Sequence, residues 1–325
     1  MRLWAAALAI LAFLTPARSE PLDVIASRID SFQNLSANTH FGPLEWRGGL
    51  SLSSDNPGFG GLSGLVLGDG CQELTAISDA GRWFTARLVY ENGGLAGLSG
   101  GAMAPMRDSK GNPQRSKVWA DAEAIARLSP GRYAVAYESR VRFGTYDLGR
   151  DGTSARFNAL SYPKEIDKGP DNGEVEALGL IDAGPLTGHF IAIAERNRDP
   201  AGATRAWAWR GKAVIAFSVQ RFEDYSITDL AVLPDGAILT LERSFSRTSL
   251  PGMAIRRFSS AMIAAGATIE PELLFAGRFP FYAIDNMEGI AVCARDGETR
   301  LTVLSDNNFN TSLQRTLLLQ FALRD

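Results

Sequence analysis

The chain has 325 residues, of which 45% are hydrophobic and 21% are charged, and it contains 33 glycines. This composition excludes intrinsic disorder, collagen and coiled coil. The 33 Lys and Arg and 36 Asp and Glu give a formal net charge of −3, so we expect no nucleic-acid partner, which would need a strongly basic surface. Glycine-rich turns between many short apolar runs favour one large all-β domain over residues 20–325.

Residues 1–19 have the pattern of a secretory signal peptide. Arg2 precedes an apolar stretch over residues 3–14, and Ala17 and Ser19 are spaced as in a cleavage site. The apolar stretch is too short for a transmembrane helix, and no later stretch is long enough. We therefore expect a periplasmic or secreted protein without a membrane span. A buried N-terminal helix is the alternative.

The two cysteines, Cys71 and Cys293, are too few for a cluster of metal-binding thiolates. In an oxidising compartment a single disulfide between them is the natural pairing. Two unpaired buried thiols are the alternative.

A repeat of five units organises the rest of the chain. Each unit opens with a short strand-like segment, and the five read GLSGLVL, DAEAIARL, EVEALGLI, ITDLAVL and NMEGIAVCA. One polar or acidic residue in each segment recurs every 53 to 60 residues, at Ser63, Glu123, Glu176, Asp229 and Glu288. A second apolar run in each unit ends in a carboxylate, at Asp79, Glu138, Glu195, Glu242 and Asp306, and a third strand-like run follows.

Units of 40 to 60 residues with about four strands are typical of β-propeller blades. We predict an all-β propeller of five blades, or of six if residues 22–60 form a short blade. The fifth unit has only three strands, and the N-terminal segment LEWRGGLSLSS can supply its outer strand and close the ring. The first and last blades would then be neighbours, and a Cys71–Cys293 disulfide would join them.

The first strand of every propeller blade lines the central channel, so the repeated acids should converge there. Hard cations such as Ca²⁺ bind sets of carboxylate oxygens, and arginines beside them can bind an anion. We expect Glu123, Glu176 and Glu288 to be catalytic, with Asp121 beside Glu123. The expected metal ligands are Asp79, Glu138, Glu195, Asp229, Glu242 and Asp306, and the expected substrate-binding residues are Arg82, Arg140, Arg196 and Arg243. The alternative is that these acids and arginines pair between blades and fix their register.

A serine-esterase site is not supported by the sequence. The run GLSGG around Ser99 matches G-x-S-x-G, but no strand–turn–helix pattern surrounds it. The chain has only two histidines, His40 and His189, and neither has an identifiable partner. The polar segment over residues 104–117 is predicted to be a loop that overhangs the channel mouth.

The strand openings EAI, EAL and EGIA, the strand ends SDAG, YESR and SDNN, and the segment FGPLEWRGGLSLSSDNPGFGGLSGL resemble the secreted bacterial phytase-like proteins, described as having esterase-like activity of phytase. The resemblance covers essentially the whole mature chain. It implies a β-propeller, a periplasmic location and hydrolysis of phosphate or carboxylic esters.

The leading hypothesis is a monomeric hydrolase of a small anionic or ester substrate, assisted by Ca²⁺ and by no organic cofactor. A lactonase-like enzyme with one calcium in the channel is a second possibility. A non-enzymatic propeller that binds a small ligand or a protein is the alternative from another functional class, because the fold alone does not decide between them.

Overall fold

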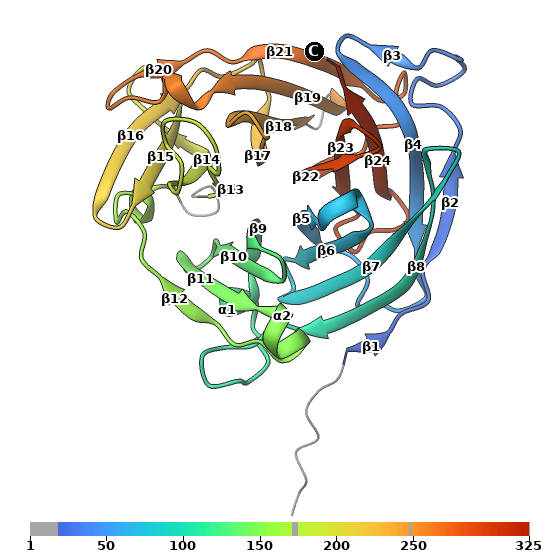
Figure 1. Cartoon of the computed structure of the whole chain (residues 1–325), viewed down its shortest axis with the longest axis horizontal. Coiled ribbons are helices and arrows are strands. Elements are labelled where there is room, and N and C mark those ends of the chain that lie inside the picture. The colour runs from blue at the N-terminus through green and yellow to red at the C-terminus, as the bar shows by residue number, and fades with distance from the viewer. Residues whose placement is uncertain (1–18, 171–174, 247–248, 325) are drawn as a thin grey trace, which may run out of the picture.

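Five β-sheets, each built on four antiparallel strands, form a ring around a central channel (Figure 1). The computed structural model describes residues 19–170, 175–246 and 249–324, so the predicted signal peptide lies, except for Ser19, outside the described residues. The five sheets confirm the prediction of an all-β propeller with five blades. Residues 22–60 do not form a blade of their own, because their strands join the last sheet.

Each blade follows the order of strands that the repeat predicts, with the first strand at the channel. The inner strands are β5 (Leu62–Leu67), β9 (Ala122–Ser129), β13 (Ala177–Leu180), β17 (Ser226–Val232) and β22 (Asn286–Arg295). The second strands are β6 (Glu73–Ser78), β10 (Arg132–Tyr137), β14 (Phe190–Arg198), β18 (Ala237–Ser246) and β23 (Glu298–Asp306). The third strands are β7 (Arg82–Glu91), β11 (Arg142–Asp147), β15 (Thr204–Arg210), β19 (Ser249–Ser259) and β24 (Thr316–Leu323).

The outer strands come from different parts of the chain. They are β8 (Gly94–Pro105), β12 (Asn158–Leu160), β16 (Ala213–Val219), β21 (Glu272–Arg278) and β4 (Leu44–Ser53). Short strands extend three of the sheets further outward: β1 (Glu20–Pro21) on β8, β20 (Thr268–Ile269) on β16 and β2 (Ile25–Ile29) on β4, which β3 (His40–Phe41) also joins. Among the described residues, the α-helices are the single turns α1 (Lys117–Ala120) and α2 (Leu148–Asp151), and no helix is long and apolar enough to cross a membrane.

The N-terminal strand β4 closes the ring, as predicted. It pairs antiparallel with β24 of the last blade, with Leu44 opposite Leu323 and Leu50 opposite Leu318. Cys71 and Cys293 form a disulfide with Cα atoms 5.5 Å apart, which joins the first blade to the last. The predicted disulfide is therefore confirmed.

The hydrophobic core lies between neighbouring blades. Trp207 and Trp209 of the third blade are buried against Phe143 and Ala134 of the second, and similar clusters fill the other seams. The inner strands approach closely at the seam that closes the ring. A Cβ on Gly289 would lie 2.7 Å from the Leu65 side chain and 3.3 Å from the Gly64 backbone, so the close approach of the two strands favours glycine there.

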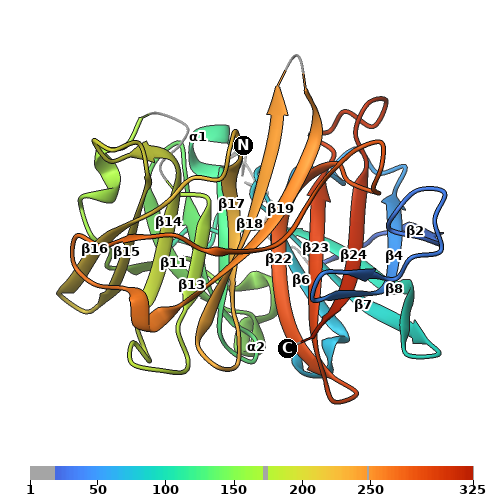
Figure 2. The same ribbon diagram turned by 90° about the horizontal axis from the view of Figure 1, so that it is seen from above.

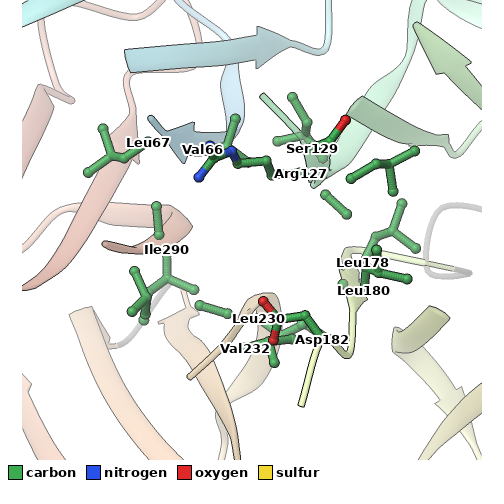
Figure 3. Close-up of a pocket in the computed structure, with 17 residues that line it drawn as sticks. Val66, Leu67, Arg127, Ser129, Leu178, Leu180, Asp182, Leu230, Val232 and Ile290 are labelled. Carbon is green, nitrogen blue, oxygen red and sulfur yellow. The ribbon is translucent and has the colours of Figure 1, made fainter. Parts of the chain in front are cut away.

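The two ends of the channel differ in chemistry. The later residues of the inner strands surround one opening, a cavity of about 300 Å³ whose lining is mainly aliphatic, including Val66, Leu178, Leu230 and Ile290 (Figure 3). The start of each inner strand and the end of each second strand lie at the other opening, and the carboxylates gather there. The carboxylates therefore gather at one end of the channel, whereas Arg127 and Asp182 are the charged residues in the lining of the other cavity.

Candidate functional site

A cavity of about 350 Å³, here called the acidic pocket, occupies the charged end of the channel. Its lining combines eight carboxylates, three cationic side chains and three neutral polar residues. They are Asp79, Asp121, Glu123, Glu138, Glu176, Glu195, Glu288 and Asp306, then Lys117, Arg196 and Arg243, then Ser63, Ser139 and Asn308. With more than twice as many acids as bases, the pocket attracts cations.

Two rings of equivalent positions generate this pocket. In four blades an extra residue interrupts the pairing of the first and second strands at the start of the inner strand, at Ser63, Glu123, Thr228 and Glu288. Glu176 completes this inner ring in the third blade, where its backbone N–H donates to Ile193 O at 3.3 Å. Such a β-bulge changes the direction of the extra residue's side chain, and in these blades the bulge lies at the channel mouth.

The outer ring lies at the ends of the second strands. Its positions, one after another around the propeller, are Asp79, Glu138, Glu195, Arg243 and Asp306. The fourth blade thus contributes a threonine and an arginine where the other blades contribute mainly acids. Arg243 is the basic member of an otherwise acidic ring.

The structure places most of the sequence-predicted residues in the acidic pocket. Those found there are Glu123, Glu176, Glu288, Asp79, Glu138, Glu195, Asp306, Arg196 and Arg243. Arg82 and Arg140 lie outside its lining: the Arg82 guanidinium lies beside Gly58, and Arg140 stacks on Trp119 with its Cζ 4.4 Å from the ring centroid.

Asp229 and Glu242 also lie outside the lining, each one residue from a ring position. The Asp229 carboxylate accepts backbone N–H bonds from Leu230 and Ile290, both at 2.8 Å, and so joins two inner strands. Glu242 is buried and accepts from Arg256 Nε at 2.6 Å. Both acids have structural partners away from the channel mouth.

Three acids form a close group on the second blade. Asp121, Glu123 and Glu138 each offer a carboxylate oxygen within 4.8 Å of the others. Lys117 bridges Asp121 and Asp79, and its Nζ lies 2.8 Å from Asp79 Oδ2. The Ser139 hydroxyl donates to Asp121.

Arg243 organises the opposite side of the pocket. Its guanidinium lies 3.2 Å from Glu288 Oε1 and 3.4 Å from Glu195 Oε1, and it donates to Asn286 Oδ1 at 2.6 Å. Asn286 in turn donates to Glu288 at 2.7 Å. Arg196 pairs with Glu195 at 2.9 Å but keeps 58% of its side chain exposed, so it can also reach a ligand.

Burial and mutual repulsion shift the pKa values of these acids. Burial, together with Glu176 and Asp121, raises the pKa of Glu123 well above its usual range, and burial with Glu195 and Glu138 does the same to the pKa of Glu176. Burial raises the pKa of Glu288 to about 7 despite the opposing effect of Arg243, and raises that of Asp306 to about 6. The acidic pocket thus retains protons near neutral pH, which a bound cation would displace.

The donor set of the acidic pocket fits a hard divalent cation. Ca²⁺ takes six to eight oxygen ligands, and the pocket offers carboxylates, serine hydroxyls and an amide. Asp79 Oδ1 is a buried oxygen without a hydrogen-bond partner among the described residues. Asp79, Asp121, Glu123 and Glu138 are the residues that would hold the ion.

Sequence reasoning missed Lys117, Ser139 and Asn308. Lys117 ends the segment that was expected to overhang the mouth, but α1 turns its side chain into the pocket, where it pairs with two acids. Ser139 and Asn308 follow outer-ring acids, so extending each repeat by two residues identifies both. Ser99 lies in the outer part of the first blade, on β8.

Matches to solved structures are remote. The N-terminal domain of Nup159 has 11% identity and a TM-score of 0.35, over 89% of this chain and 98% of that chain. YCF48 bound to D1 peptide has 12% identity and a TM-score of 0.37, and the match covers 84% of this chain and 68% of that chain. The tail fiber of a Staphylococcus aureus phage has 10% identity and a TM-score of 0.43, and the match covers 91% of this chain and 55% of that chain.

A search of curated proteins finds no match to this sequence. Residues 57–309 match the model described as phytase-like, esterase-like activity of phytase, and these residues include both rings of the acidic pocket. Because the match spans most of the chain, the protein belongs to the phytase-like family.

Proposed function

We propose that the protein is a secreted or periplasmic, monomeric hydrolase of phosphoester or carboxylic ester substrates and that it acts at the acidic pocket with Ca²⁺. The observation that carries the proposal is the convergence of eight carboxylates and three cationic side chains in one cavity of about 350 Å³. Membership of the phytase-like family supports hydrolysis. The disulfide supports an oxidising compartment.

The residues of the acidic pocket have complementary roles in this proposal. Arg243 is held in place by Glu195, Asn286 and Glu288, and with the exposed Arg196 it binds an anionic oxygen of the substrate. Ca²⁺ bound by the carboxylates would supply positive charge that polarises the ester or phosphoryl oxygen.

Proton transfer belongs to the inner-ring glutamates. A general acid or base works best when its pKa lies near the working pH, and Glu288 has a pKa of about 7. Glu288 accepts a proton from the attacking water. Glu176, whose pKa is well above the usual range, holds a proton that the leaving group can take, while Glu123 is a ligand of the ion.

The test combines thermal unfolding with turnover. A ligand that binds only the folded state stabilises it by about 2.7 kcal/mol at 100 times its Kd, so Ca²⁺ added after EDTA should raise Tm by several degrees. The same protein should hydrolyse p-nitrophenyl phosphate or p-nitrophenyl acetate. Glu123→Gln should lose most of the Ca²⁺-dependent rise in Tm and most of the turnover.

Glu73→Gln is the matched control, because Glu73 is exposed on β6 outside the acidic pocket. It should retain both properties. No Ca²⁺-dependent shift and no turnover would contradict the proposal. That result would favour the non-enzymatic propeller, in which the acids are ion-pair partners of the arginines.

A further inference from the structure

An apolar cavity of about 620 Å³, here called the apolar groove, lies on the same side of the ring as the acidic pocket. It is lined by Phe245, Leu250, Pro251, Phe279, Ile284, Asp285, Asn310, Leu313, Gln314 and Arg315. The hairpin of β18 and β19, which carries Phe245 and Leu250, projects on the side of the ring where α1 places Lys117 (Figure 2). Several of the large side chains are accessible: Phe245 is 65% exposed and Leu313 is 80% exposed.

Three chain segments pass directly from the acidic pocket to the apolar groove. On β18, Phe245 follows Arg243 by two residues, a step of about 7 Å along a strand. Before β22, Asp285 is adjacent to Asn286, which is hydrogen-bonded to Glu288.

The third segment is the loop after β23. Asn308 of the acidic pocket donates to Gln314 of the apolar groove at 3.1 Å. Residues that line the two cavities are therefore close in the chain or hydrogen-bonded to one another, and the two cavities are neighbours.

We propose that the apolar groove binds the apolar acyl or alkyl part of the substrate while its ester or phosphoester group lies in the acidic pocket. This inference rests on the proposed function and narrows its substrate class to amphiphilic esters. The volume and lining agree with a ligand site, since such pockets span about 300–1,000 Å³ and combine apolar walls with a few polar groups. The polar groups are the Asp285–Arg315 pair, 3.3 Å apart, and two amides.

The first test measures binding without turnover. Octylphosphonate and methylphosphonate share a head group, and each buried methylene is worth about fourfold in affinity. With Ca²⁺ present, calorimetry should show octylphosphonate binding at least tenfold more tightly. Phe245→Ser and Leu313→Ser should each reduce that preference severalfold and leave methylphosphonate binding unchanged.

Leu273→Ser is the matched control, because Leu273 is 45% exposed on β21 outside the groove. It should keep the full preference. Equal affinity for the two phosphonates, or a preference that survives Phe245→Ser and Leu313→Ser, would overturn the inference. So would a dimer that both variants dissociate without altering the preference, because a second copy of the chain would then occupy the groove.

The second test measures turnover of p-nitrophenyl octanoate and p-nitrophenyl acetate. The inference is supported if wild type has a higher kcat/KM for the octanoate than for the acetate, and if Phe245→Ser lowers the value for the octanoate toward that for the acetate. Hydrolysis of both esters at equal kcat/KM would sustain the proposed function but overturn the role of the groove. If neither ester nor p-nitrophenyl phosphate is hydrolysed, the proposed function fails, and the phosphonate preference alone decides whether the groove binds apolar chains.

Discussion

Burial in the acidic pocket, more than repulsion from neighbouring acids, raises the pKa of Glu288. A carboxyl group with a raised pKa binds its proton more tightly in the folded state, so its contribution to stability is present below the unfolded pKa and is lost as the pH rises through the folded pKa. For Glu288 this window extends from 4.5 to about 7. In EDTA, we expect Tm to fall as the pH rises across this window, as measured by differential scanning calorimetry.

Glu288→Gln should flatten this fall, because an amide carries no titrating proton. Glu73→Gln, on the exposed part of β6, should leave it unchanged. Ca²⁺ should stabilise the wild type more at pH 7 than at pH 5, since the ion competes with protons for the carboxylates. An identical pH dependence for Glu288→Gln and wild type would refute the assignment of the raised pKa.

At the scale of strands, the pairing of β18 with β19 explains the position of Glu242. Glu242 faces Ala254 across the ladder, and Arg256 reaches it from two residues further along β19. Both side chains are at least 97% buried. Loss of one partner from a buried ion pair costs about 3–5 kcal/mol, so Glu242→Gln should lower the urea-derived free energy of unfolding by that order.

Ca²⁺ binding by the folded Glu242→Gln variant should match wild type, because Glu242 lies outside the acidic pocket. Replacing both partners, as Glu242→Leu with Arg256→Met, should restore part of the lost stability. If Glu242→Gln instead kept full stability and lost the Ca²⁺-dependent rise in Tm, Glu242 would be a metal ligand, as its place in the repeat first indicated.

The strands could be predicted from the sequence because five copies of one pattern reinforce each other. The residues that the fourth blade contributes to the two rings could not be predicted in this way. Counting residues aligned Asp229 with Glu288, but the bulge makes Thr228 the equivalent of Glu288 and Ser63. The hydrogen bonds agree: Thr228 Oγ1 donates to Met287 O, and Ser63 Oγ to Ala122 O. A shift of one residue reverses which face a side chain occupies, and sequence spacing does not resolve it.

Over the whole molecule, the site depends on the closure of the ring. Asp79 belongs to the first blade and Asp306 to the last, and Asp306 Oδ1 accepts the backbone N–H of Leu62 across the seam at 3.1 Å. The disulfide crosses the same seam, and β4, which precedes the first blade in the chain, pairs with β24 of the last blade. Any loosening of this seam therefore separates acids of the pocket as well as destabilising the fold.

Replacing both cysteines by serine tests that coupling. The disulfide links positions 222 residues apart, and removing such a constraint typically costs about 2–4 kcal/mol. We expect the Cys71→Ser, Cys293→Ser variant to unfold at a lower urea concentration and to need more Ca²⁺ for the same rise in Tm, because the seam between the blades of Asp79 and Asp306 keeps the Leu62–Asp306 hydrogen bond but loses its covalent link. Dithiothreitol should reproduce both effects in wild type and have none on the variant. A variant with lower stability but unchanged Ca²⁺ dependence would show that β4 and the hydrogen bonds of the seam hold the acidic pocket together without the disulfide.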